Sequence, residues 1–483
     1  KKASFIEQEI YREQSNNPCS ERRLKMYKDK IVNRIQSLRQ ELSNKMGLAF
    51  QDILPAEQVA KAMEAEGIKS RNCLFSPVLT LWTFVAQVLD ADRSCRKAVS
   101  RVIAYCAVIG LPAPSALTGG YCRARKRLSE NLLHRLMRDV GHSLQARATG
   151  NDLWCGRHVK IVDGSSVSMP DTAENQQEYP QPSTQAKGCG FPIARIVVLF
   201  GLATGGVIDL VFGSLHVGEN VLFRQLWSQL TCGDVLLGDR GFFSYANIAS
   251  LLGKNVDTVL RLAQSGRVKF EQQKQLGPND QLIKWPRPQH RPKGMSKEEF
   301  KSLPEYLTLR LVHFRIDTPG FRSKEIFLVT TLLDPLAYPL VKLAQLYRDR
   351  WECELNLRGL KTSMKMEILG GKTPQMVRKE VYAHILAYDL VRSLMWNAAD
   401  SSYLLPLRFS LKGAIQHLSV FAPLISTASS PAAQTLSLYL LQAIAETLPN
   451  RHNRIEPRRK KRRPKSYGWL QQPRNVLKDK LKK

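Results

Sequence analysis

The order of strand and helix patterns between residues 151 and 263 constrains the fold of this 483-residue chain more than any other feature. Three strand-like segments come first: the alternating HVKIVDGSSVSM, then the apolar, β-branched ARIVVLFGLAT and GVIDLVFGSLHV. A helix (ENVLFRQLWSQL), a short strand (DVLLGDRGF), a helix near 244–253 and a last strand (DTVLRLAQ) follow. This succession predicts an α/β fold in which helices cover the faces of a mixed sheet.

The charge of the chain limits its partners. It contains 72 Lys and Arg against 42 Asp and Glu, a formal net charge of +30. Such an excess is typical of proteins that bind a polyanion, with nucleic acid the first candidate and an anionic membrane surface the second. The sequence has no uninterrupted apolar run of about 18 residues, so we expect no membrane partner. Nine cysteines without a C-x-x-C pair indicate reduced thiols rather than disulfides or a zinc site.

The remaining segments extend this domain at both ends. Apolar residues recur at three and four positions before residue 150, which predicts helices, and a Gly-, Pro- and Gln-containing stretch with short strand signals predicts an insertion. We expect a polar N-terminal arm (1–30), a helical DNA-binding region (31–150), the first part of a catalytic core (151–263), a β-rich insertion (264–325), the second part of the core (326–400), and a helical C-terminal region with a basic tail (401–483).

The segment YRDRWECELNLRGLKTSM, residues 347 to 364, is predicted to be one helix with an unusual face. Tyr347, Arg350, Glu354 and Lys361 fall within about a 60° arc at roughly 100° per residue, and Arg358 lies on the same side. A solvated face would interleave acids and bases. A lone carboxylate among cations and a phenol therefore indicates a function for Glu354.

Two aspartates complete a candidate site with Glu354. Asp163 lies in the first strand and Asp239 ends the fourth, although either alone could be a turn or capping residue. A ribonuclease-H-like sheet uses all three, because its first and fourth strands are neighbours and a later helix supplies the third carboxylate. Oxygen ligands without His or Cys suit Mg²⁺ or Mn²⁺. Two ions about 3.5–4 Å apart would hold the attacking and leaving oxygens of a displacement at phosphorus, while the cationic stripe grips the phosphates.

With these residues the chain resembles the insertion-sequence-four family of bacterial DDE transposases. Tyr347, Arg350, Glu354 and Lys361 fill the family's Tyr-Arg-Glu-Lys signature without a gap, and Asp163 in DGSSVSMPDT and Asp239 in GDRGFF match its two catalytic aspartates. The long interval from Asp239 to Glu354 resembles the family's β-strand insertion. GCGFPIAR, TTLLDP and RIEPRRKKRRPKSYGWL also resemble family segments, so the resemblance runs from about residue 70 to the tail.

The resemblance implies a transposase of the bacterial cytoplasm, associated with the nucleoid when bound to DNA. It implies recognition of terminal inverted repeats, a homodimer acting on paired ends, two Mg²⁺ ions that Mn²⁺ could replace, and cut-and-paste transfer to target DNA. Some relatives cut through a DNA hairpin and place a flipped base on a Trp of the insertion. Trp285 is the candidate for that role, and a packing role is its alternative.

DNA contacts are expected near the carboxylates and in the tail, where fourteen Lys or Arg and two acidic residues follow from Arg451 onward. Two alternatives to an active transposase stay open: an inactive DNA-binding relic and a two-metal nuclease of the same fold. The relic is disfavoured because the carboxylates and the signature are all retained together. The DNA-binding residues expected are Tyr347, Arg350, Arg358 and Lys361 on the helix, Arg240 beside Asp239, and Arg458, Lys460 and Arg462 in the tail.

Overall fold

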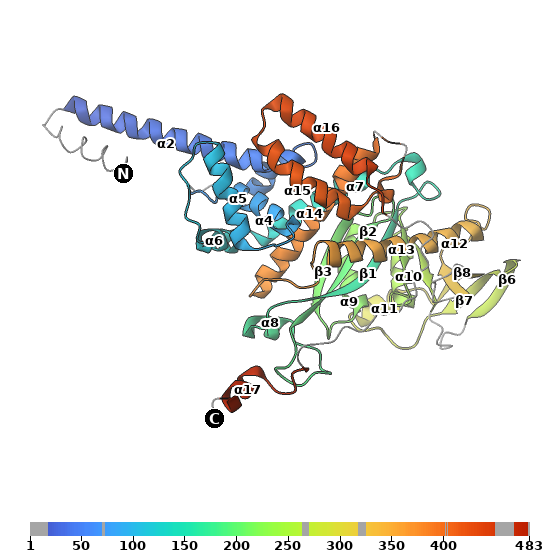
Figure 1. Cartoon of the computed structure of the whole chain (residues 1–483). Helices are drawn as coiled ribbons and strands as arrows, with labels where there is room; N and C mark the ends of the chain where they lie inside the picture. The colour runs from blue at the N-terminus through green and yellow to red at the C-terminus, as the bar shows by residue number, and fades with distance from the viewer. Residues whose placement is uncertain are drawn as a thin grey trace.

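A nine-stranded mixed sheet forms the centre of the molecule in the computed structural model (Figure 1), which describes residues 18–69, 73–262, 270–316, 325–400, 402, 404–449 and 468–481. The strand order is β3-β2-β1-β4-β5-β9-β8-β7-β6. The strands are β1 (Val159–Ser168), β2 (Ile193–Gly201), β3 (Val207–Ser214), β4 (Val235–Gly238), β5 (Asp257–Arg261), β6 (Glu271–Gly277), β7 (Asp280–Pro286), β8 (Tyr306–Arg315) and β9 (Glu325–Thr330).

The sheet is mixed, as the sequence predicts. β1 pairs antiparallel with β2 and parallel with β4, and β5 runs parallel to β4. β9 then pairs antiparallel with β5, and β8, β7 and β6 continue the antiparallel part. Segments on both sides of the predicted insertion therefore form one continuous sheet. The predicted domain boundaries themselves stay a prediction.

Helices cover both faces of the sheet. Ile161 of β1 and Leu237 of β4 face one core, whereas their neighbours Val162 and Leu236 face the other, because successive side chains of a strand point to opposite faces. The first face is covered by α7 (Glu130–Ala146), α12 (Leu340–Asp349), α13 (Trp351–Arg358) and α14 (Pro374–Asp400), and the second by α9 (Glu219–Gln225) and α10 (Tyr245–Leu252).

The N-terminal region is helical and packs against α14, which is buried along almost its whole length. Serine caps begin three of its helices, because the hydroxyls of Ser76, Ser94 and Ser129 accept the backbone N–H groups of Leu79, Lys97 and Leu132. Its helices before α7 are α2 (Pro18–Met46), α3 (Ala56–Ala65), α4 (Pro77–Leu89), α5 (Cys95–Val108) and α6 (Gly119–Arg127).

Helix α2 starts earlier than the sequence pattern suggests. It begins at Pro18, inside the predicted polar arm, and extends away from the rest of the molecule in Figure 1. The segment lacks apolar periodicity, but its Lys, Arg, Glu and Leu residues have straight side chains with high helix propensity. Residues 1–17 of the predicted arm lie outside the described residues.

The C-terminal region adds a helix pair beside the N-terminal helices (Figure 1). Helices α15 (Leu411–Thr427) and α16 (Ser430–Glu446) pack on each other and on α14. The remaining helices are α8 (Ala173–Glu178), α11 (Lys297–Ser302) and α17 (Arg474–Leu481). In the described part of the chain, no helix combines the length and apolar character needed to cross a bilayer. The cysteines whose side chains are described are free thiols.

A buried ion pair joins the insertion to the segment before α12. Arg310 of β8 is fully buried and makes two hydrogen bonds with Asp280 of β7, Nε–Oδ1 at 2.8 Å and Nη2–Oδ2 at 2.6 Å. Its Nη1 also donates to the carbonyl oxygen of Tyr338 at 2.8 Å. Since α12 begins at Leu340, this pair fixes the insertion strands relative to the helices that carry the candidate site.

Candidate active site

The two candidate aspartates lie on neighbouring parallel strands. In the register of β1 and β4, Val162 lies opposite Gly238, so Asp163 and Asp239 are the next residues on each strand. Strand alternation directs both toward the face that α13 covers, because Ile161 and Leu237 already face that side. The adjacency of these two aspartates, expected for a ribonuclease-H-like sheet, is present in the structure.

The helix with the third carboxylate is not the single helix that the sequence predicts. It divides into α12 and α13 at Arg350, and a π-helical turn follows at Gly359–Ser363. Arg350 keeps right-handed helical torsion angles (φ −51°, ψ −28°), so the chain continues in nearly the same direction. Single π-turns occur frequently at functional sites. Periodicity alone could not reveal either irregularity.

Three of the four signature residues contact one another across this junction. The Arg350 guanidinium lies 5.5 Å from the ring centroid of Tyr347, which is buried in the core, and its Nη2 donates to Glu354 Oε1 at 3.0 Å. The Arg350 side chain is 14% exposed and that of Glu354 is 40% exposed. The predicted stripe is therefore a contact network in which Glu354 already has a cationic partner.

The electrostatics bring all three carboxylates and Arg350 into one group. Burial raises the pKa of Asp163 to about 6, against the lowering effect of Arg350 and of the Gly164 N–H. The charges of Asp239 and Glu354 raise it further. Burial alone would lower the pKa of Arg350, but the anionic groups around it raise that pKa above its usual value. One buried guanidinium thus compensates several nearby acids.

The donor set fits a hard divalent cation, although no coordination sphere is formed. Among the described residues, no three His, Cys, Asp or Glu side chains are grouped so that they could hold a metal ion. Glu354 is directed to Arg350, while Asp163 and Asp239 each accept a nearby backbone N–H. All three nevertheless offer carboxylate oxygens, the ligands that Mg²⁺ and Mn²⁺ prefer. A bound cation would also relieve the repulsion that raises the pKa of Asp163.

Glu219 is a fourth carboxylate at this edge that the sequence analysis missed. A Cβ atom on Gly164 would lie 2.6 Å from Glu219 Oε1, and one on Gly241 would lie 3.0 Å from Asp239 Oδ1 and 3.6 Å from Glu219 Oε2. Glycines at positions 164 and 241 therefore leave room for the Glu219 carboxylate beside the ends of β1 and β4. The available signal was an acid as the first residue of the helix after the third strand.

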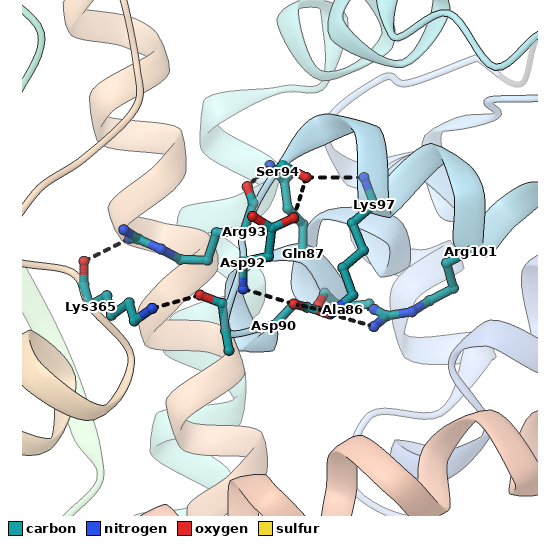
Figure 2. Close-up of polar contacts among 10 residues, drawn as sticks. Ala86, Gln87, Asp90, Asp92, Arg93, Ser94, Lys97, Arg101 and Lys365 are labelled. Carbon is teal, nitrogen blue, oxygen red and sulfur yellow. Dashed lines mark hydrogen bonds and ion pairs between the residues drawn. The ribbon is translucent and has the colours of Figure 1, made fainter.

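The segment after the π-helical turn is attached to the N-terminal region, as Figure 2 shows. Arg93 Nη1 donates to the carbonyl oxygen of Lys365 at 2.6 Å, and Lys365 Nζ donates to that of Ala91 at 2.7 Å. Both Arg93 and Lys365 have positive φ angles, 54° and 55°, which are uncommon outside glycine. The two residues are 272 positions apart, so no local pattern could predict this contact.

The other predicted DNA contacts are distributed over different surfaces. Arg240 follows Asp239 and is exposed, and Lys361 lies in the π-helical turn. Arg358 is exposed and lines a groove toward the C-terminal region. The tail residues Arg458, Lys460 and Arg462 lie outside the described residues.

Trp285 is surrounded by other aromatic rings. Its side chain is 8% exposed and stacks on Phe243, with ring centroids 5.0 Å apart and planes at 2°. Tyr245 and Phe270 contact it edge to face. This arrangement favours the packing interpretation over the base-receiving one, since Phe243 already occupies one face of the indole.

The chain is similar to known transposases over the region that contains the candidate site. Residues 154–390 match the family model described as a transposase DDE domain. The chain is 27% identical over 377 residues to the transposase InsG for insertion sequence element IS4 of Escherichia coli (strain K12), covering 77% of this chain and 80% of InsG. It is 26% identical over 137 residues to the putative transposase InsZ of the same organism, covering 28% of this chain and 44% of InsZ.

Among solved structures, the chain matches a piggyBac transposase synaptic complex with hairpin DNA, with a TM-score of 0.44 and 13% identity, covering 84% of this chain and 85% of that one. The matched sequence region contains Asp163, Asp239 and Glu354 in order, together with the Tyr-Arg-Glu-Lys spacing. The central region of the chain therefore matches a transposase DDE domain, and most of the chain is similar to the transposase of an IS4 insertion sequence.

Proposed function

We propose that the protein binds the terminal inverted repeats of its element, cleaves the ends by metal-assisted phosphoryl transfer and joins the 3′-hydroxyls to target DNA. The observation that supports the proposal is that Asp163 and Asp239 follow paired positions on β1 and β4, while Glu354 contacts Arg350, whose charge acts on both aspartates. The order β3-β2-β1-β4-β5 supports a ribonuclease-H-like core. The similarity to transposases supports DNA as the substrate.

Asp163, Asp239 and Glu354 would hold two Mg²⁺ ions, for which Mn²⁺ could substitute. Bound ions would stabilise the charge on the attacking and leaving oxygens of the phosphodiester. Glu354 would exchange part of its contact with Arg350 for this role. Arg350 is then available to bind a phosphate oxygen with its planar pair of N–H groups, and Lys361 would supply a second positive charge to the scissile strand.

We also propose that two copies of the chain act together on paired ends. The net charge of +30 supports binding to DNA, because the phosphates would compensate the positive charge of each copy. A nuclease of the same fold would share the carboxylates but would only cut, and a relic would bind ends without cutting. These alternatives differ from the proposal in the products that they release.

A cleavage and joining assay tests the proposal. Purified protein is incubated with a labelled end of its own element, Mg²⁺ and a target plasmid. We expect release of a 3′-hydroxyl end and its joining to the plasmid, and no reaction in excess EDTA. Cleavage without joining would favour the nuclease, and end binding without cleavage would favour the relic.

Arg350 and Lys361 give a separate prediction about the phosphates. Arg350→Ala and Lys361→Ala should each lower the rate of end cleavage about 10- to 100-fold, because a charge-assisted hydrogen bond contributes about 1.5–3 kcal/mol. Arg350→Lys should recover only part of the rate, since an ammonium cannot replace a planar fork. Single-turnover cleavage measures this effect.

Lys342→Ala is the control for those variants, because Lys342 is an exposed cation on α12 outside the signature. It should cleave as wild type does. If Arg350→Ala and Lys361→Ala also cleave at the wild-type rate, these two cations do not hold the scissile phosphates.

The basic tail is proposed to bind DNA without sequence preference. From Arg451 to Lys483 it carries fourteen basic and two acidic residues. Each phosphate that it neutralises should contribute about −0.9 to the slope of log K against log salt. Deletion of 451–483 should therefore flatten the salt dependence of binding to random duplex DNA, measured by fluorescence anisotropy. An unchanged slope would exclude the tail as a DNA contact.

A further inference from the structure

A groove of about 780 Å³ lies between the catalytic helix and the C-terminal helical region. Asn356, Arg358 and Thr362 line it from α13 and the π-helical turn. Ser410 and Lys412 line it from the beginning of α15, and Arg392 of α14 lies between these two walls. The groove is therefore built by segments from three separate parts of the chain.

Its lining is cationic. Of the described residues that line it, Arg358, Arg392 and Lys412 are basic and none is Asp or Glu. Arg358 and Lys412 are exposed on opposite walls, so both charges are available to a ligand. The absence of a lining carboxylate distinguishes this groove from an ordinary surface of interleaved ion pairs.

Arg392 adds a charge that cannot move away. It is 7% exposed, and its Nε donates to the Tyr388 hydroxyl at 2.9 Å while its Nη2 donates to Asn356 Oδ1. Both acceptors are neutral, and burial raises the pKa of Asp389, the acid within electrostatic range of Arg392, well above its usual value, which favours the uncharged form of that acid. A fixed, nearly dehydrated cation below an open groove attracts anions more strongly than an exposed one.

The N-terminal end of α15 adds to the positive potential of the groove. Ser410 is its N-cap, and the Ser410 hydroxyl accepts the Gly413 N–H at 3.2 Å. The helix runs for 17 residues, so its N-terminal end carries a partial positive charge toward the groove. The hydroxyls of Thr362 and Ser363, both exposed, add neutral hydrogen-bond donors on the opposite wall.

We infer that this groove binds a second segment of DNA backbone, with Arg358 and Lys412 holding phosphates from opposite sides. None of Tyr347, Arg350, Glu354 and Lys361 lines it, so it is separate from the scissile-phosphate site. Pro449 lines its edge, and the strongly basic tail sequence begins two residues later. The inference rests on the proposed function, because it assumes that DNA is the substrate.

Salt-dependent binding in the full chain tests it. Arg358→Gln, Lys412→Gln and their double variant are made in a Glu354→Ala background, so that DNA is bound without being consumed. Each single variant should reduce the salt slope of log K by about 0.9, and the double variant by about twice that. Lys254→Gln is the matched control, since Lys254 is exposed in the turn before β5, at the opposite edge of the sheet from Asp239. It should keep the parent slope.

The outcomes separate the groove from the proposed function. If wild type cleaves its ends but the groove variants keep the slope of Lys254→Gln, the groove is not a DNA site and the proposed function stands. If wild type neither binds nor cleaves its ends, the proposed function itself fails. A free nucleotide is the alternative phosphate ligand of the groove, and calorimetry with deoxyadenosine monophosphate tests for it. Saturable nucleotide binding that Lys412→Gln abolishes, with an unchanged DNA slope, would overturn the inference.

Discussion

Glu354→Ala should bind a labelled terminal repeat as tightly as wild type while losing cleavage by roughly three orders of magnitude or more. Loss of one ligand from a metal site removes several kcal/mol of transition-state stabilisation, and each 1.36 kcal/mol is a tenfold change in rate. Binding should persist because phosphate contacts come from Lys and Arg, and because the removed carboxylate repels DNA. A gel-shift assay and single-turnover release of the 3′-hydroxyl measure the two effects.

Glu367→Ala is the matched control for that variant. Glu367 is an exposed acid shortly after the π-helical turn, and its backbone carbonyl, which the substitution keeps, accepts the Ser168 N–H. We expect it to bind and cleave as wild type does. Normal cleavage by Glu354→Ala would remove Glu354 from the site.

Asp280→Ala should destabilise the protein by about 3–5 kcal/mol. This is the cost of breaking a buried ion pair by removing one partner, since Arg310 would keep an uncompensated charge in the core. The effect should reach α12 and the candidate site that follows it, because Arg310 also donates to Tyr338 just before α12. Urea unfolding followed by circular dichroism measures the loss.

Two variants give this prediction its controls. Asp280→Asn should lose less, because its amide oxygen can still accept one of the Arg310 N–H groups. Glu298→Ala on α11, an exposed acid in the same insertion, should change the free energy of unfolding by no more than about 0.5 kcal/mol. An Asp280→Ala midpoint equal to that of Glu298→Ala would show that the pair adds no stability.

The mixed sheet could be predicted because strand signals depend on local sequence. Apolar, β-branched runs such as β2 and the buried strand before Asp239 identify themselves without their partners. The adjacency of Asp163 and Asp239 required one further step, a topology that pairs the first and fourth strands. Once that topology is chosen, alternation along each strand determines the face on which the carboxylates lie.

Long-range contacts could not be predicted in the same way. The Arg93–Lys365 contact and the Arg310–Asp280 pair depend on segments that meet only in the folded chain. The break at Arg350 could not be predicted either. Arg350 keeps helical torsion angles, so the break needs no glycine or proline that would mark it in the sequence. Glu219 was missed since a first-turn acid ordinarily serves the helix dipole.

Asp239→Cys tests most directly the proposal that these carboxylates bind a metal ion. A thiolate is a poor ligand for Mg²⁺ but a better one for softer ions, so replacing a metal-bound carboxylate should change the metal requirement. We expect Asp239→Cys to bind the terminal repeat, to release no 3′-hydroxyl with Mg²⁺, and to regain measurable cleavage with Mn²⁺. Cleavage by Asp239→Cys at the wild-type rate in Mg²⁺, or by wild type in excess EDTA, would contradict the assignment of these carboxylates to a metal.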